Sequence, residues 1–190
     1  MSNPKLDTIV FVGKTGSGKG TQAKLISENL KYKLFSTGDK FRELRLKETP
    51  LGRKVEEIYD AGLLMPHWLA SFVFEEAILN LDDGDKIVFE GTGRTLEESV
   101  VFDEICDWLD REYIIFNLNV KDEEVIKRQK ERGRDSLDEM DKIKRRLEEY
   151  RFNTSKSIDF FRKKGKLVEI NGEVSPEEVH KEILNHLGQI

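Results

Sequence analysis

Cysteine is almost absent from this sequence, which holds a single one, Cys106, among 190 residues. A lone cysteine cannot form an intramolecular disulfide and cannot supply a four-cysteine zinc site. Cys106 lies in a stretch of apolar periodicity, so we expect it to be a small buried side chain. An intramolecular disulfide and a four-cysteine zinc site are therefore excluded as sources of stability.

Long apolar runs are also missing, and so is an excess of positive charge. No apolar stretch reaches the roughly 18 residues of a membrane-spanning helix, and the first residues lack a basic segment followed by an apolar one. We therefore expect a cytoplasmic protein that does not enter a membrane. The 32 Lys and Arg against 37 Asp and Glu give a net charge of −5, which makes nucleic acid an unsuitable partner.

Short apolar runs alternate with longer helical patterns along the chain. The expected strands are residues 9–12, 34–35, 87–89, 113–118 and 167–170. Continuous apolar runs bounded by helices are typical of parallel strands that are covered on both faces. The sequence therefore predicts one α/β domain with a doubly wound parallel sheet of about five strands.

The expected helices include residues 19–30 and a long helix from about Asp138 to Lys164. About fifty residues of helical pattern separate the second and third strands, with breaks at 49–52 and 65–66. Pro66 suits the first turn of a helix that runs to about Leu81. This insertion is long for a simple crossover, so we expect part of it to form a small subdomain.

The first strand is followed by a glycine-rich turn with the sequence GKTGSGKGTQ, which begins at Gly13. Glycines allow backbone N–H groups to converge on an anion, and the next helix adds its positive N-terminal end. Lys19 supplies a charge for the β- and γ-phosphates, and the hydroxyl of Thr21 can bind Mg²⁺. Gly20 takes the place where the usual motif has that hydroxyl residue. The strand before the turn and the helix after it argue against a mere flexible loop.

A second set of anion-binding residues distinguishes a kinase from other phosphate-loop proteins. Thr37 and Arg42 follow the second strand, and Arg94 follows the third, so all three lie at the edge where open α/β sheets bind ligands. An arginine fork suits phosphate, and later arginines supply further cations at 128, 132, 134, 145 and 146. A GTPase switch would need the motif NKxD, but the fourth strand ends with NLNV.

Seven segments together resemble the adenylate kinases and related nucleoside monophosphate kinases: GKTGSGKGTQ, STGDKFR, DAGLLMP, EGTGRT, RQKERGR, IKRRLEEY and GKLVEINGE. The resemblance covers almost the whole chain and implies a P-loop NTPase fold, with a five-stranded parallel sheet and helices on both faces. It implies one kinase domain with a core of residues 1–35, 66–130 and 147–190, a monophosphate-binding insertion of about 36–65, and a short lid of about 131–146. Such a lid is too short to hold zinc.

The resemblance implies reversible, Mg²⁺-dependent transfer of the γ-phosphoryl group of ATP to AMP, giving two ADP. The implied catalytic residues are Lys19, Arg94, Arg128, Arg134 and Arg146. The ATP site would comprise Gly16, Ser17, Gly18, Lys19, Gly20, Thr21, Arg128, Arg132 and Val174. The AMP site would comprise Thr37, Gly38, Arg42, Leu63, Leu64, Met65, Gly91, Arg94, Glu98, Arg134 and Arg146. Mg²⁺ would be held through Thr21, Asp39, Glu90 and water, and the partners would be nucleotides, with a monomer as the default state.

The sequence departs from the family pattern at three places. Gly93 replaces the proline of Asp-Gly-Phe-Pro-Arg, which would leave Arg94 less preorganised. Ser136 and Leu137 stand where the lid normally has Asp-Asp. Glu98 replaces a glutamine that can pair with adenine, whereas a carboxylate only accepts hydrogen bonds and suits guanine or cytosine at least as well.

Three alternatives follow from these departures. Glu98 could be a solvated residue on a helix surface, with AMP as the acceptor. It could instead favour a kinase for CMP, UMP or GMP, or one of broad base specificity. The altered positions could also belong to a nucleotide-binding scaffold without activity, although the retained Lys19 and Arg94 argue against this reading.

Overall fold

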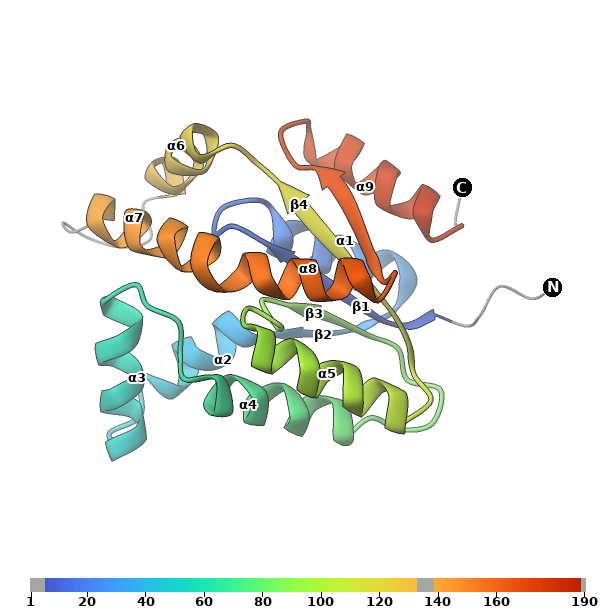
Figure 1. The fold of residues 1–190 in the computed structure, drawn as a ribbon, viewed down its shortest axis with the longest axis horizontal. Coiled ribbons are helices and arrows are strands. Elements are labelled where there is room, and N and C mark those ends of the chain that lie inside the picture. Colours follow the sequence, from blue (N-terminus) through green and yellow to red (C-terminus); the bar gives the residue numbers. More distant parts are fainter. Residues whose placement is uncertain (1–5, 133–138, 189–190) are drawn as a thin grey trace.

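The computed structural model describes residues 6–132 and 139–188. Five strands form one parallel sheet in the order β2-β3-β1-β4-β5 (Figure 1). Their bounds are Leu6–Gly13 for β1, Lys33–Ser36 for β2, Ile87–Glu90 for β3, Glu112–Asn119 for β4 and Leu167–Asn171 for β5. The predicted α/β fold is confirmed. Each strand is longer than its apolar run, because ladder pairing continues over flanking residues that the pattern does not mark.

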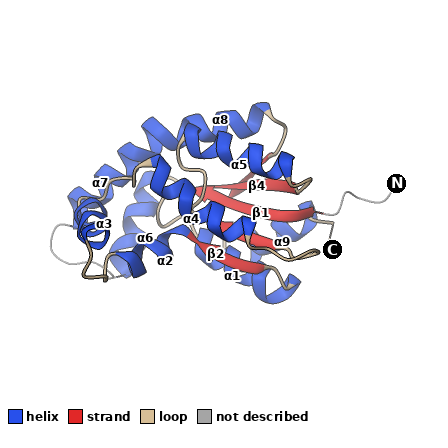
Figure 2. Cartoon of the chain, turned by 90° about the horizontal axis from the view of Figure 1, so that it is seen from below, coloured by secondary structure: helices blue, strands red, loops and turns tan. Residues whose placement is uncertain are grey.

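Helices cover both faces of the sheet (Figures 1 and 2). On β1, Val10 and Val12 pack with α4 (His67–Leu79), α5 (Leu96–Trp108) and α8 (Ser155–Lys163), and Cys106 is buried there, as expected. Ile9 and Phe11 point to the other face, where α1 (Lys19–Leu30) and α9 (Pro176–His186) pack. The alternation along β1 therefore places one hydrophobic core on each side of the sheet.

The insertion between β2 and β3 contains α2 (Thr37–Leu44), α3 (Pro50–Asp60) and α4. Phe41, Val55 and Met65 belong to a separate hydrophobic cluster that joins these three helices. The helix predicted from Pro66 to Leu81 begins one residue later and ends two residues earlier than expected. Pro66 has extended backbone angles and precedes the first turn, and α4 ends at Leu79, before a tight turn.

The long helix predicted over residues 138–164 is divided into three parts. After α6 (Asp122–Arg132), the described chain continues with α7 (Glu139–Glu149), a π-helical turn η1 (Tyr150–Thr154) and α8 (Figure 1). The wider π turn lies where the helix passes the cavity described below, and helical periodicity in the sequence does not reveal it. Within residues 6–132 and 139–188, no helix is long and apolar enough to cross a membrane.

Candidate active site

A cavity of about 1060 Å³ opens at the carboxyl edge of the sheet. The ends of β1, β2 and β3 supply Gly13, Ser36 and Glu90 to its wall. Much of the rest of the wall comes from the loop after β1 and from α1, α2, the segment after α3, the loop after β3, α7 and η1. Ligands bind at this edge in open α/β sheets because the strand-to-helix loops converge there.

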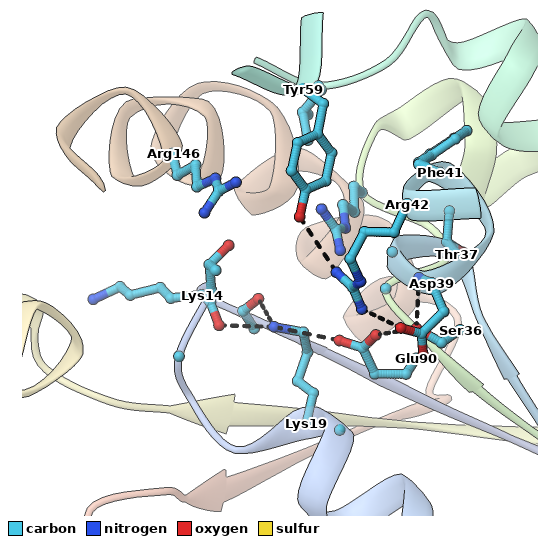
Figure 3. A pocket seen from close by; sticks show the side chains of 18 of the residues that line it. Lys14, Lys19, Ser36, Thr37, Asp39, Phe41, Arg42, Tyr59, Glu90 and Arg146 are labelled. Atoms are coloured by element: carbon cyan, nitrogen blue, oxygen red, sulfur yellow. Dashed lines mark hydrogen bonds and ion pairs between the residues drawn. The ribbon is translucent and has the colours of Figure 1, made fainter. Parts of the chain in front are cut away.

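The loop after β1 forms one side of the cavity. The Lys19 side chain is 6% exposed, and its ammonium donates to the carbonyls of Gly13 at 2.9 Å and Lys14 at 2.7 Å. It also lies 4.0 Å from Oε1 of Glu90 (Figure 3). Gln129 of α6 braces the loop by donating to the carbonyl of Thr15 at 3.1 Å. The charge of Lys19 is therefore fixed over the glycine-rich turn.

The structure brings most of the predicted phosphate-loop residues to the cavity wall. Gly16, Gly18, Gly20 and Thr21 line it together with Lys19. Ser17 is buried instead and does not line it. A Cβ at Gly13 would lie 2.8 Å from the Leu118 carbonyl and 2.9 Å from the Ser17 hydroxyl, so only glycine fits against this neighbouring strand.

Another part of the cavity wall holds the residues predicted after β2. The Ser36 hydroxyl accepts from the backbone N–H of Asp39 at 3.2 Å and donates to Glu90 Oε2 at 2.9 Å. Arg42 forms an ion pair with Asp39 and donates to the Tyr59 hydroxyl at 3.4 Å (Figure 3). Carboxylates, hydroxyls and a guanidinium are thereby gathered at one end of the cavity.

Thr37 is also held at this end, because its hydroxyl shares a hydrogen bond of 2.9 Å with that of Thr92. Gly38 and the segment Leu63, Leu64 and Met65 line the same wall. These residues come from the start of α2 and from the chain between α3 and α4, as the sequence predicted.

The loop after β3 carries Arg94 into the cavity wall. Gly93 has φ +70°, which a proline cannot adopt, so the proline of the family pattern is incompatible with this turn. The backbone N–H of Arg94 donates to Glu98 Oε2 at 2.9 Å, and the Ser157 hydroxyl donates to the Gly93 carbonyl. Glu98 is 2% exposed and lines the cavity, so the reading of Glu98 as a solvated surface residue is wrong.

Sequence reasoning missed Tyr59, whose ring meets three cations besides Arg42. Its centroid lies 4.8 Å from the Arg45 guanidinium, 5.1 Å from the Lys142 ammonium and 5.6 Å from the Arg146 guanidinium. Lys142 and Arg146 belong to α7, whereas Tyr59 is in α3. No sequence signal connects residues so far apart, because the cluster exists only once α7 lies against the insertion.

Some predicted residues lie outside this cavity. Arg128 donates to Glu124 at 2.7 Å and to the Gly172 carbonyl at 2.9 Å, and neither Arg128 nor Val174 lines the wall. Arg132 ends α6, but its side chain is not among those described. Arg134, Ser136 and Leu137 lie outside the described residues. The roles predicted for these residues remain predictions.

The described wall of the cavity concentrates positive charge in a net acidic protein. Eight Lys and Arg side chains line it against five Asp and Glu. Burial raises the pKa of Glu98, although hydrogen bonds from Arg94 and its positive charge oppose that rise. A local excess of cations raises the concentration of anionic ligands at the cavity.

The oxygen donors in the cavity fit Mg²⁺ that arrives with a nucleotide. The hydroxyl of Thr21 and the carboxylates of Asp39 and Glu90 line one cavity. In the described part of the chain, no group of three or more His, Cys, Asp or Glu could hold a metal by itself. Mg²⁺ is commonly bound by one or two carboxylates together with substrate phosphates and water, so this small donor set is sufficient.

Comparisons with known proteins agree over nearly the whole chain. The family model described as "Adenylate kinase" matches residues 11–166. "Adenylate kinase 1" of Nostoc sp. is 36% identical, over 95% of this chain and 98% of that protein. "Adenylate kinase" of Azobacteroides pseudotrichonymphae is 35% identical over 96% and 97% of the two chains, and that of Thermus thermophilus is 31% identical over 95% and 96%.

Proposed function

The chain belongs to the adenylate kinase family, a phosphotransferase family, and we propose that it reversibly transfers the γ-phosphoryl group of ATP to AMP, giving two ADP. One observation carries the proposal: a single cavity is lined both by Lys19 of the glycine-rich loop and by Arg42 and Arg94, which follow β2 and β3. Two phosphate groups can therefore meet between two separate sets of cations, as direct transfer requires.

On the donor side, the backbone N–H groups of residues 16–21 would bind the ATP phosphates, and the Lys19 ammonium would follow the migrating group. We assign Arg128 and Arg132 to the ATP side and Val174 to contact with the adenine. The hydrogen bond from Arg128 to the Gly172 carbonyl supports this, because it joins α6 to the loop that carries Val174.

On the acceptor side, Thr37, Gly38, Arg42 and Arg94 would bind the AMP phosphate, and Leu63 to Met65 together with Gly91 and Glu98 would line its nucleoside pocket. A phosphate oxygen of AMP attacks the γ-phosphorus in line while the bond to the β-phosphate oxygen breaks. No covalent enzyme intermediate is required. Arg134 and Arg146 would lie over the phosphates as charge moves between them.

Mg²⁺ bound with ATP would neutralise charge on its β- and γ-phosphates. Asp39, Glu90 and Thr21 would orient the water around it. The hydroxyl of Ser36 supports this role, because it bonds both the backbone N–H of Asp39 and the carboxylate of Glu90 and so keeps the two acidic residues together.

Transfer without hydrolysis requires that water be kept from the γ-phosphate. We propose that the insertion of about 36–65 and the lid of about 131–146 close over a core of 1–35, 66–130 and 147–190. A hydrophobic cluster packs α2 and α3 of the insertion on α4 of the core, so α4 is the surface against which the insertion would move. We further propose that the enzyme acts in the cytoplasm, as a monomer, on free nucleotides.

A kinase for CMP, UMP or GMP is the second candidate, because Glu98 places a buried carboxylate in the acceptor half of the cavity. The test combines ATP and Mg²⁺ with AMP, GMP, CMP or UMP and separates the products by chromatography. Fastest turnover with AMP supports the proposal. Faster turnover with another monophosphate would make that monophosphate the acceptor in place of AMP. If none of the four is phosphorylated, a nucleotide-binding scaffold without activity is the better interpretation.

A further inference from the structure

Glu98 is the one buried carboxylate in the described wall of the cavity. Burying an ionised carboxylate is costly unless hydrogen bonds compensate for the lost water. The burial of such a residue calls for a structural or functional explanation. The hydrogen bonds around Glu98 show which segment of the backbone it holds in place.

The carboxylate lies inside the turn that begins α5. Its Oε2 accepts from the backbone N–H of Arg94 at 2.9 Å, and its own N–H donates to the Thr95 hydroxyl at 3.3 Å. Burial raises the pKa of Glu98, and hydrogen bonds from Arg94, Thr95 and Gly93 lower it. The residues that form these hydrogen bonds with Glu98 all lie in the loop that carries Arg94.

The other side of the loop is held by α8. The Ser157 hydroxyl donates to the Gly93 carbonyl and lies 2.7 Å from the Ser99 hydroxyl. The Arg94 guanidinium packs directly on Gly91, where a Cβ would lie 2.5 Å from its Nη2. Because the side chain rests on its own loop, the path of the backbone determines where the guanidinium points.

We propose that Glu98 is a positioning residue for Arg94: its carboxylate fixes the loop backbone so that the guanidinium meets the phosphate of the acceptor. This inference rests on the function proposed above and deepens it. It differs from the base-reading role implied for position 98, because a residue that positions Arg94 affects every monophosphate alike.

The first test uses the isosteric variant Glu98→Gln, which keeps an acceptor near the Arg94 N–H but removes its charge. Charge-assisted hydrogen bonds are about twice as strong as neutral ones, so we expect kcat/KM for AMP to fall about tenfold and KM for ATP to stay within about twofold. Glu98→Ala removes the acceptor and should lose about a hundredfold, so Gln gives partial rescue. The control is Glu104→Gln, an exposed carboxylate of the same helix, which should match the wild type.

Base reading predicts the opposite sign for Glu98→Gln. A glutamine can pair with adenine, so a base-reading residue would gain preference for AMP over GMP and CMP. A gain of this kind overturns the positioning role, and so does wild-type behaviour of the variant. A loss by one common factor for all accepted monophosphates supports it.

A double-mutant cycle with Arg94→Ala locates the effect. If Glu98 acts through Arg94, adding Glu98→Gln to Arg94→Ala changes kcat/KM for AMP by less than about twofold. A full, additive tenfold loss in that background contradicts the proposal. The affinity for AMP, measured by calorimetry on the same variants, separates non-additive from additive effects without depending on catalysis. Failure of the wild type to transfer phosphate is thus distinguishable from failure of the positioning role.

Discussion

The ammonium of Lys19 is held by two loop carbonyls and faces the cavity from the donor side. Lys19→Met keeps much of the side-chain length but removes the charge that we propose stabilises the migrating phosphoryl group. Removing one preorganised electrostatic group costs about 10²–10³ in kcat, and we expect a loss of this size. Steady-state kinetics with ATP and AMP measure it, with Lys181→Met on the exposed side of α9 as the control. A kcat within tenfold of wild type would remove Lys19 from the mechanism.

The burial of the Glu98 carboxylate should make the stability of the fold depend on pH. Burial raises its pKa above the ordinary 4.5 in spite of the nearby Arg94, so the folded state holds this proton more tightly than the unfolded chain. Its contribution to stability is therefore full below pH 4.5 and is lost as pH rises through the folded pKa.

In the variant Glu98→Gln, no group titrates at this position. The free energy of unfolding of the variant minus that of the wild type should therefore increase as pH rises from about 4 to 7. Each unit of pKa elevation corresponds to about 1.4 kcal/mol of this difference. Urea unfolding of both proteins across this range measures it. A difference that is constant with pH would mean that the carboxylate is not buried in solution. Together with the kinetic test, this variant should combine lower activity with relatively higher stability at neutral pH.

At the scale of elements, the sequence predicted the sheet and the gathering of Lys19, Arg42 and Arg94 at one cavity, because both depend on local patterns. The apolar runs mark the strands, and parallel strands bring Lys19, Arg42 and Arg94 to one edge without further information. The π turn at 150–154 and the cations around Tyr59 were not predicted. These features depend on how α7 packs against the insertion, which neither periodicity nor a short motif encodes.

Contact between α7 and the insertion can be tested at Gly62. This residue has φ +74°, and a Cβ there would lie 2.8 Å from Lys142 Cγ and 3.1 Å from the Lys142 carbonyl. Lys142 also pairs with Asp60 at 3.6 Å, and Arg145 donates to the Ala61 carbonyl at 3.2 Å. Gly62→Ala should therefore push α7 from the insertion and raise KM for AMP about tenfold.

Gly84 offers a matched control for that variant. It has φ +83°, but a Cβ there meets nothing within 4 Å. Both alanine variants incur about 1–2 kcal/mol of backbone strain, which lowers Tm by about 2–4 °C per kcal/mol in a domain of this size. Only Gly62→Ala should change KM for AMP. Equal KM values for the two variants would show that the contact with α7 does not support the acceptor site.

At the scale of the whole molecule, the distribution of charge separates the cavity from the rest of the surface. The protein has a net charge of −5, yet the described cavity wall carries eight cationic side chains and five acidic ones. Nucleotide anions are attracted to this local excess, and salt screens that attraction. Raising the ionic strength from about 0.02 M to about 0.3 M should increase KM for AMP about threefold or more and leave kcat nearly unchanged. A KM that is independent of salt would contradict this role of the cavity charge.

The central claim is that donor and acceptor phosphates meet in one cavity between Lys19 and the two arginines, Arg42 and Arg94. ATP labelled at its γ-phosphate tests this claim most directly when it is incubated with Mg²⁺ and AMP and the products are separated. We predict that the label moves into the β-phosphate of newly formed ADP, with little in inorganic phosphate. Label released mainly as inorganic phosphate, at the same rate with and without AMP, would show hydrolysis in place of transfer and would contradict the account.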